Sequence, residues 1–223
     1  MHRTIRHPFN ASKGLESRPV QINEDRSLSL HGIHFDRIDA VFTIKTPKND
    51  LGTNLSREFE SMYSEFTARE SPYGSEVDRL DAFSITLTTG FLSRQDGFGL
   101  EELNFHRANF NAFWKAGTNQ TLYPDNNLVG NANIFLADIR ERFPHGCIFI
   151  TRKGYIGYGS IFARRDDHCV IFQGGFAPYI VRRHEETRTF KLVSEGYIHG
   201  LMKGEVAPMV HAKEFDIEEI VLS

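Results

Sequence analysis

The chain has 223 residues, of which 40% are hydrophobic and 25% are charged, so it is long enough to bury a core as one domain or two small ones. A net charge of -3 and a pI near 6.4 provide no basic surface for a phosphate backbone, which argues against nucleic-acid binding. Two cysteines exclude a disulfide-stapled secreted scaffold, and no apolar run approaches the ~20 residues of a membrane span. We therefore expect a cytoplasmic protein that binds neither nucleic acid nor membrane.

Two strand patterns open the chain. Residues 27–35 alternate polar and apolar side chains, with Gly32 as a bulge or a close contact, and residues 38–44 form a second strand pattern. Turn residues at 47–50 follow. The first strands of the fold are therefore expected within 26–45.

A helical period then replaces the strand period. Asn54 is the expected N-cap of the first helix, Ser75 and Asp78 form a capping box for the second, and Gly90 ends that second helix. We predict helices at 55–66, 77–87, 100–116 and 131–142.

Short strands punctuated by glycines fill the remainder of the chain. We predict them at 147–151, 155–162, 168–173, 178–184, 188–194, 196–200 and 215–222. Such spacing is typical of a barrel or a sandwich to which both chain ends contribute. The predicted fold is a single α+β domain, 1–223, with a small β-barrel or strongly curved antiparallel sheet. Its helical insertion, 54–142, lies between the second and third strands, and its β-rich half is 146–222.

Motifs for cofactor or metal chemistry are weak in this sequence. The glycines of 154–159 continue into a strand rather than a helix, which favours a glycine-kinked strand over a phosphate loop. His145, Cys147, His168 and Cys169 could supply zinc ligands, but neighbours in a strand point to opposite faces. Buried thiols and surface histidines explain these four residues better. We predict no metal and no cofactor.

Acidic residues at 166, 167, 185 and 186 lie among the cationic residues of the β half. The cationic residues are Arg152, Lys153, Arg164, Arg165, Arg182, Arg183 and Arg188. A solvated surface with salt bridges is the expected interpretation. The alternative is an anionic ligand group held by one arginine.

The stretch from Glu195 to His199 offers the best candidate chemistry. If it is one strand, then Glu195, Tyr197 and His199 share a face, and the carboxylate could orient the imidazole as an acid, a base or a hydrogen-bond donor. The alternative is a buried polar network that holds the barrel closed.

Phenylalanine is unusually frequent, with 19 residues. Core packing alone could explain this number, but aromatic helices over a barrel mouth can also enclose an apolar ligand. The candidate walls of such a pocket are Phe110, Trp114, Tyr155 and Tyr158.

Several blocks of the chain resemble fungal heterokaryon-incompatibility (HET) proteins. The blocks are 148–157, 169–182 and 190–205, with weaker agreement at 9–12 and 28–32. In that family these blocks follow an N-terminal incompatibility domain, which is similar to Toll/interleukin-receptor domains and triggers cell death. The chain has no room for that domain, so the resemblance implies the C-terminal module alone. Ser160 and Ser194 depart from the family's expected Pro and Gly, and the cell-death function is not carried over.

Two functions of different classes follow. The first is a cofactor-independent cyclase or pericyclase of fungal secondary metabolism, which folds an apolar terpenoid or polyketide for an intramolecular [4+2] cyclisation. There Trp114→Ala should damage turnover more than stability. The alternative is a recognition or regulatory module of incompatibility signalling, without enzymatic activity. It predicts a protein partner and an exposed apolar patch.

Overall fold

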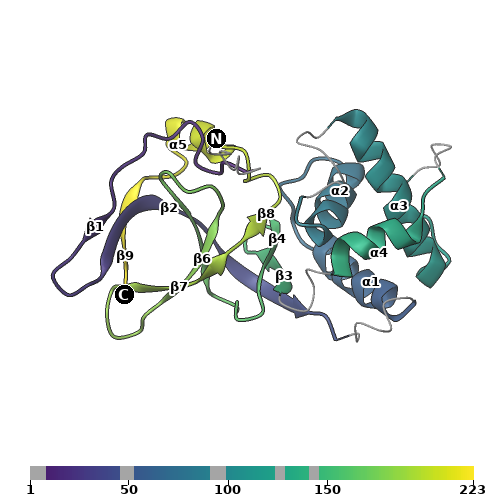
Figure 1. The fold of residues 1–223 in the computed structure, drawn as a ribbon, viewed down its shortest axis with the longest axis horizontal. Helices are drawn as coiled ribbons and strands as arrows, with labels where there is room; N and C mark the ends of the chain where they lie inside the picture. Colours follow the sequence, from purple (N-terminus) through teal and green to yellow (C-terminus); the bar gives the residue numbers. More distant parts are fainter. Residues whose placement is uncertain (1–8, 46–52, 91–98, 124–128, 141–145) are drawn as a thin grey trace, which may run out of the picture.

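The computed structural model describes residues 9–45, 53–90, 99–123, 129–140 and 146–223. It places a β half beside a layer of helices (Figure 1). The strands are β1 (Gln21–Ile22), β2 (Leu28–Thr43), β3 (Gly146–Thr151), β4 (Ile156–Ser160), β5 (His168–Phe172), β6 (Tyr179–Arg183), β7 (Phe190–Glu195), β8 (Tyr197–Ile198) and β9 (Glu218–Leu222). The helices are α1 (Thr53–Thr67), α2 (Glu76–Leu87), α3 (Leu100–Thr118), α4 (Ala132–Arg140) and α5 (Val206–His211).

The strand β2 is one 16-residue strand where the sequence pattern predicted two. The pairing register shifts between His34 and Asp36 and again between Ile38 and Ala40, so the strand bends without ending. Its first part pairs with β9 and β5, and its last part pairs with β3. The predicted break after residue 35 was wrong because a bulge disturbs the alternation of side chains while the backbone pairing continues.

The sheet closes partly into a ring. Its strand order is β5-β6-β7-β9-β2-β3-β4-β8, and β5 also pairs with β2, which joins β2, β5, β6, β7 and β9 into a closed circuit. The β7–β9 pair is parallel and the other pairs are antiparallel. The predicted α+β class, the small barrel and the helical insertion before β3 are confirmed.

Alternating side chains of the ring strands build two separate cores. One cluster is formed by Val170, Phe172, Val181 and Ile220, with Leu30, Tyr179, Phe190 and Leu222 packed against it. The opposite set, which includes Ile33, Cys169 and Ile180, packs against β3 and β8. A Cβ on Gly157 would lie 2.3 Å from the Phe149 ring, so this glycine is needed for the close packing of β3 against β4.

The helical layer packs its own aromatic core against the outer face of β3 and β4. The core includes Phe59, Phe83, Phe110 and Trp114, and Ile148, Ile150 and Ile156 join it from the β half. Ser75 and Asp78 form the predicted capping box at the start of α2, and Gly90 follows its end with φ +77°. Asn54 is not an N-cap, because α1 already begins at Thr53.

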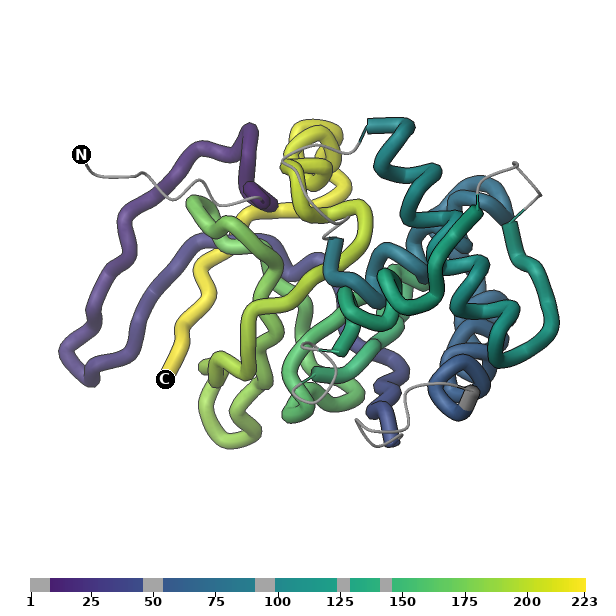
Figure 2. The backbone as a smooth tube through the Cα atoms, turned by 45° about the vertical axis from the view of Figure 1, so that its right-hand side comes forward, coloured from purple at the N-terminus to yellow at the C-terminus, as the bar shows by residue number. Residues whose placement is uncertain are grey.

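The N-terminal segment lies against the connection between β8 and α5, beside the barrel. Asn10 donates its N–H to the Met202 carbonyl at 2.9 Å, and Figure 2 shows the N-terminal segment passing the C-terminal one. The helix α5 was missed because it lies within a stretch that the strand pattern left between two strands. The turn at 47–50 and the end of the fourth predicted helix, 141–142, lie outside the described residues. Within the described ranges, no helix has both the length and the apolar character to cross a membrane.

Candidate functional site

Tyr197 and His199 lie together where the helical layer meets the β half. Tyr197 belongs to β8 and pairs with Tyr158 of β4, and its hydroxyl oxygen is 3.0 Å from His199 Nδ1. Tyr73, between α1 and α2, donates its hydroxyl to the His199 carbonyl at 2.9 Å and accepts the Ile156 N–H at 3.2 Å. These bonds tie the helical insertion to the barrel, and we call Tyr73, Tyr197 and His199 the junction site.

Burial keeps the side chains of the junction site uncharged. Desolvation lowers the pKa of His199 from 6.5 to about 4, against an opposing effect of the Asp81 carboxylate. Desolvation also raises the pKa of Tyr73 and Tyr197 well above their usual value. At neutral pH the imidazole is therefore neutral and both phenols keep their protons. When Tyr197 donates to Nδ1, the ring proton lies on Nε2, where it can serve as a hydrogen-bond donor.

Glu195 is not part of the junction site. It is exposed at the end of β7 and pairs with Tyr179 of β6. Gly196 donates its N–H to the Pro178 carbonyl at 2.8 Å, and the chain beyond it pairs with β4. The prediction that Glu195, Tyr197 and His199 share one strand face was wrong, because the chain changes its pairing partner at Gly196.

The four predicted pocket walls lie in two different places. Phe110 and Trp114 are 0% and 1% exposed in the helical core, with ring centroids 5.5 Å apart. Tyr155 lies at the junction, 5.9 Å from the Tyr73 ring, and Tyr158 is opposite Tyr197. The structure therefore brings Tyr155 and Tyr158 near the junction site but leaves Phe110 and Trp114 in helix packing.

A buried polar network in the helical layer was missed by the sequence analysis. Arg107 donates Nε to Asp81 Oδ1 at 2.8 Å, and the Tyr123 hydroxyl donates to the same oxygen at 2.8 Å. Ser84 Oγ lies 2.9 Å from the Tyr123 hydroxyl and 3.1 Å from His106 Nε2. We call these five residues the Asp81 network. The sequence feature that could have indicated this network is the pair of polar residues, Asp81 and Ser84, among the apolar residues of the predicted helix.

The Asp81 network has the arrangement of a structural hydrogen-bond network and not that of an activated nucleophile. Ser84 is 0% exposed, and the Asp81 carboxylate binds Arg107 and Tyr123 instead of the imidazole. Burial lowers the pKa of His106 to about 4, so this ring is neutral at pH 7. The network holds Tyr123 against α2 and satisfies polar groups that the surrounding aromatics would otherwise leave unpaired.

The two thiols are buried and free. Burial raises the pKa of Cys147 to about 12 and raises that of Cys169 as well, so neither is a thiolate at pH 7. Among the described residues, no group of three His, Cys, Asp or Glu side chains is arranged to hold a metal ion. His145 lies outside the described residues.

The predicted salt-bridged surface of the β half is confirmed at three arginines. Arg152 pairs with Asp166, Arg165 with Asp39, and Arg182 with the buried Asp167. The last pair is bidentate, because both carboxylate oxygens of Asp167 accept from the Arg182 guanidinium at 2.8 Å.

Comparison with known proteins gives two matches. Residues 130–217 match the Het-6 beta-barrel domain. A stretch of 69 residues is 33% identical to heterokaryon incompatibility protein 6, OR allele, of Neurospora crassa, and it covers 30% of this chain and 10% of that protein. The match thus spans about a tenth of the relative's length, and no solved structure matches the chain. Both matches confirm the resemblance that the sequence blocks indicated.

Proposed function

We propose that this chain, which is related to the heterokaryon-incompatibility proteins, acts as a recognition module in incompatibility signalling, without an enzymatic activity of its own. The observation that carries the proposal is the Het-6 beta-barrel match over residues 130–217, which includes most of the β half. The named relative is called an incompatibility protein, and the match lies within a small part of it.

A preformed turn between β4 and β5 supports the recognition role. Ile161 and Phe162 are 46% and 68% exposed there, although both are large and apolar. The turn is held by the Ala163 N–H to the Ser160 carbonyl at 2.9 Å and by Arg182, which donates to the Phe162 carbonyl at 2.8 Å. Because the backbone of this turn is already ordered, little of its conformational entropy is lost when a partner covers the two side chains.

The proposal is tested by strain confrontation. Deletion of the gene, or replacement by Phe162→Asp, is expected to change the survival of fused cells between strains that are otherwise incompatible. The matched control is Ile22→Asp, which places the same charge on a side chain that is 75% exposed on β1. A deletion strain with unchanged compatibility would contradict the recognition role. Equal effects of Phe162→Asp and Ile22→Asp would contradict its assignment to the β4–β5 turn.

The predicted cyclase is a second candidate function, and the junction site is the observation that favours it. A neutral imidazole beside a protonated phenol can donate a hydrogen bond to a substrate carbonyl without proton transfer. Tyr155, whose ring is 5.9 Å from that of Tyr73, and Tyr158, which pairs with Tyr197, would be the residues to contact an apolar substrate. Phe110 and Trp114 would act only by supporting the helices.

The cyclase is tested by mass spectrometry of metabolites from the host strain and a deletion strain. Loss of a product with accumulation of an uncyclised isomer of the same mass would support it. Complementation with Tyr197→Phe should restore little product, because the hydroxyl that orients His199 is lost. An unchanged metabolite profile after deletion would contradict the cyclase and leave the recognition role standing.

A further inference from the structure

An open cleft of about 480 Å³ lies on the β half, outside the junction site. It follows one edge of β2, where pairing with β9 ends at Gly32 and pairing with β3 begins at Ile38. The strand β5 occupies the opposite edge of β2 over this stretch. A gap between two pairing strands thus leaves room for a ligand of ordinary small-molecule size.

Flat aromatic surfaces line this cleft. The His34 and His168 rings have centroids 5.0 Å apart, and Phe190 packs against both at 5.0 and 5.1 Å. Phe215 also lines the cleft, with Lys153 Nζ 4.0 Å from its ring centroid. Such walls favour a ligand that has a planar, apolar part.

The two imidazoles of the cleft are neutral at pH 7. Burial lowers the pKa of His34, and it lowers that of His168 to about 4. The positive charge of Arg37 adds to the lowering at both rings, against Glu218 at His34 and Asp167 at His168. The nearby guanidinium also disfavours a metal cation between the two Nδ1 atoms, which are 3.2 Å apart.

Two cations of the cleft, Arg37 and Lys153, have no ion pair among the described residues, and the Lys153 ammonium lies over the Phe35 and Phe215 rings. Both carboxylate oxygens of Asp36 accept backbone N–H groups, from Arg37 at 2.8 Å and from Lys153 at 2.7 Å. Arg152 is paired with Asp166 outside the cleft. Within the described part of the chain, the exposed Arg37 guanidinium has no ion pair. Its five N–H donors are therefore available to an anion.

We infer that this cleft binds a small aryl anion, whose carboxylate or phosphate pairs with Arg37 and whose ring lies against the aromatic walls. A planar guanidinium matches either oxyanion with two parallel hydrogen bonds. The inference is independent of the incompatibility role, because it requires only the cleft and not a protein partner at the β4–β5 turn.

Isothermal titration of the full chain tests this inference with four probes: phenyl phosphate, benzoate, inorganic phosphate and benzyl alcohol. We expect saturable binding of at least one aryl anion, and the stronger of phenyl phosphate and benzoate identifies the oxyanion. Arg37→Gln should weaken that binding at least about tenfold. Arg57→Gln is the matched control, because it removes the same charge from an exposed position on α1. This variant should bind the aryl anion with the affinity of the wild type.

Three results would overturn the inference. One is the absence of saturation with either aryl anion. Another is equal affinity in wild type and Arg37→Gln, once circular dichroism shows that the variant is folded. The third is binding of inorganic phosphate or benzyl alcohol as tight as that of the best aryl anion, because the anion or the ring would then contribute nothing.

Discussion

The helical layer and the β half use histidine in opposite ways. His106 lies 4% exposed inside the Asp81 network, and its Nε2 contacts Ser84. His34 and His168 face an open cleft, beside an arginine that has no ion pair among the described residues. Burial lowers the pKa of His106 and His168 alike, to about 4. His168 is itself only 8% exposed, so a lowered pKa reports burial, and the position at the wall of a cleft separates a histidine that can meet a ligand from a structural one.

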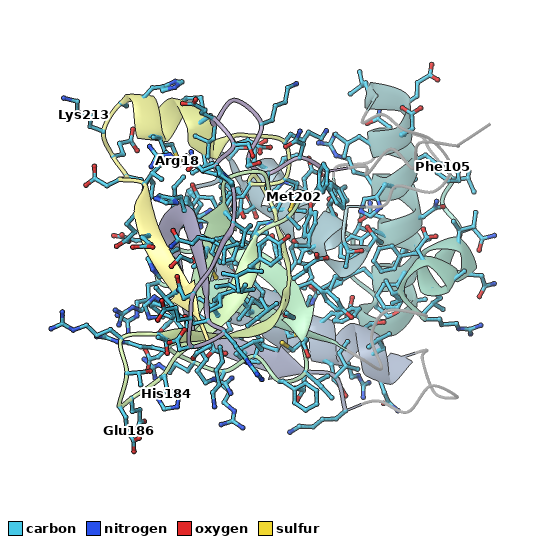
Figure 3. The ribbon with its side chains drawn as sticks, turned by 60° about the vertical axis from the view of Figure 1, so that its left-hand side comes forward. Arg18, Phe105, His184, Glu186, Met202 and Lys213 are labelled. Carbon is cyan, nitrogen blue, oxygen red and sulfur yellow. The ribbon has the colours of Figure 1, made fainter. Side chains whose placement is uncertain are left out.

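Aromatic side chains show the same contrast. In the helical layer they pack on one another, as Phe110 does against Phe135 at 5.1 Å and Trp114 at 5.5 Å. In the β half, rings such as Phe190 and Phe215 remain at a cleft surface. Figure 3 shows Phe105 on the side of α3 that faces away from the barrel, whereas Met202 lies centrally between the two regions.

The largest expected effect is on the aromatic core of the helical layer. Trp114→Ala should lower the free energy of unfolding by about 3–5 kcal/mol, because Trp114 is 1% exposed and its removal leaves a large cavity in the core. Urea denaturation measures the loss. Phe105→Ala on the same helix is the control and should cost far less, since Phe105 is 47% exposed. Equal losses would contradict the close packing of Trp114 in the helical core.

The next effect is on the Asp81 network. Asp81→Asn should cost about 3 kcal/mol, because the partly buried Arg107 and the Tyr123 hydroxyl lose a charged acceptor. Thermal or urea unfolding provides the measurement. Asp166→Asn breaks the exposed pair with Arg152 and should change stability by less than about 1 kcal/mol. A similarly small change for Asp81→Asn would contradict the stabilising role of the Asp81 network.

A smaller effect depends on pH. His106 has a folded pKa of about 4 and an unfolded value near 6.5, so the unfolded chain binds the proton more tightly. Its contribution to stability is present above pH 6.5 and is lost as the pH falls toward 4. Between pH 7 and pH 5 this one group should remove about 2 kcal/mol from the free energy of unfolding.

The pH effect is measured by urea unfolding at the two pH values. His106→Gln should reduce the pH dependence by about 2 kcal/mol and leave the contributions of His168 and His199 in place. His211→Gln, at an exposed position of α5, is the matched control variant. If His106→Gln kept the full pH dependence, the protons would be taken up elsewhere, and His168 and His199 would be the next groups to replace.

The smallest effect concerns the start of α2. Ser75→Ala removes the side-chain acceptor of the Asp78 N–H, 3.1 Å away, and should cost about 1 kcal/mol. The control is Ser61→Ala, which removes an exposed hydroxyl from the interior of α1 and should not destabilise. No loss for Ser75→Ala would mean that tertiary packing alone holds this helix end, although its capping box is complete.

Local chemistry made part of the fold predictable. The capping box at Ser75 and the left-handed Gly90 bracket α2 as expected, because both are decided by neighbours within one turn. The strand periods in the β half were likewise recognisable. The candidate site was predictable only in part: the Tyr197–His199 contact joins residues two apart, whereas the exclusion of Glu195 depends on the switch from β6 to β4 at Gly196.

By itself, the sequence determined the α+β class, the helical insertion and the short strands of the barrel, because period and turn chemistry act over a few residues. The tertiary structure alone decided which polar side chains meet. Asp81 and Tyr123 are joined across 42 positions, and His34 and His168 across 134. No local pattern encodes such distances, since they are set by how a bent β2 closes the ring and how α2 packs on α3. The Asp81 network and the cleft at Arg37 could therefore be recognised only in the folded structure.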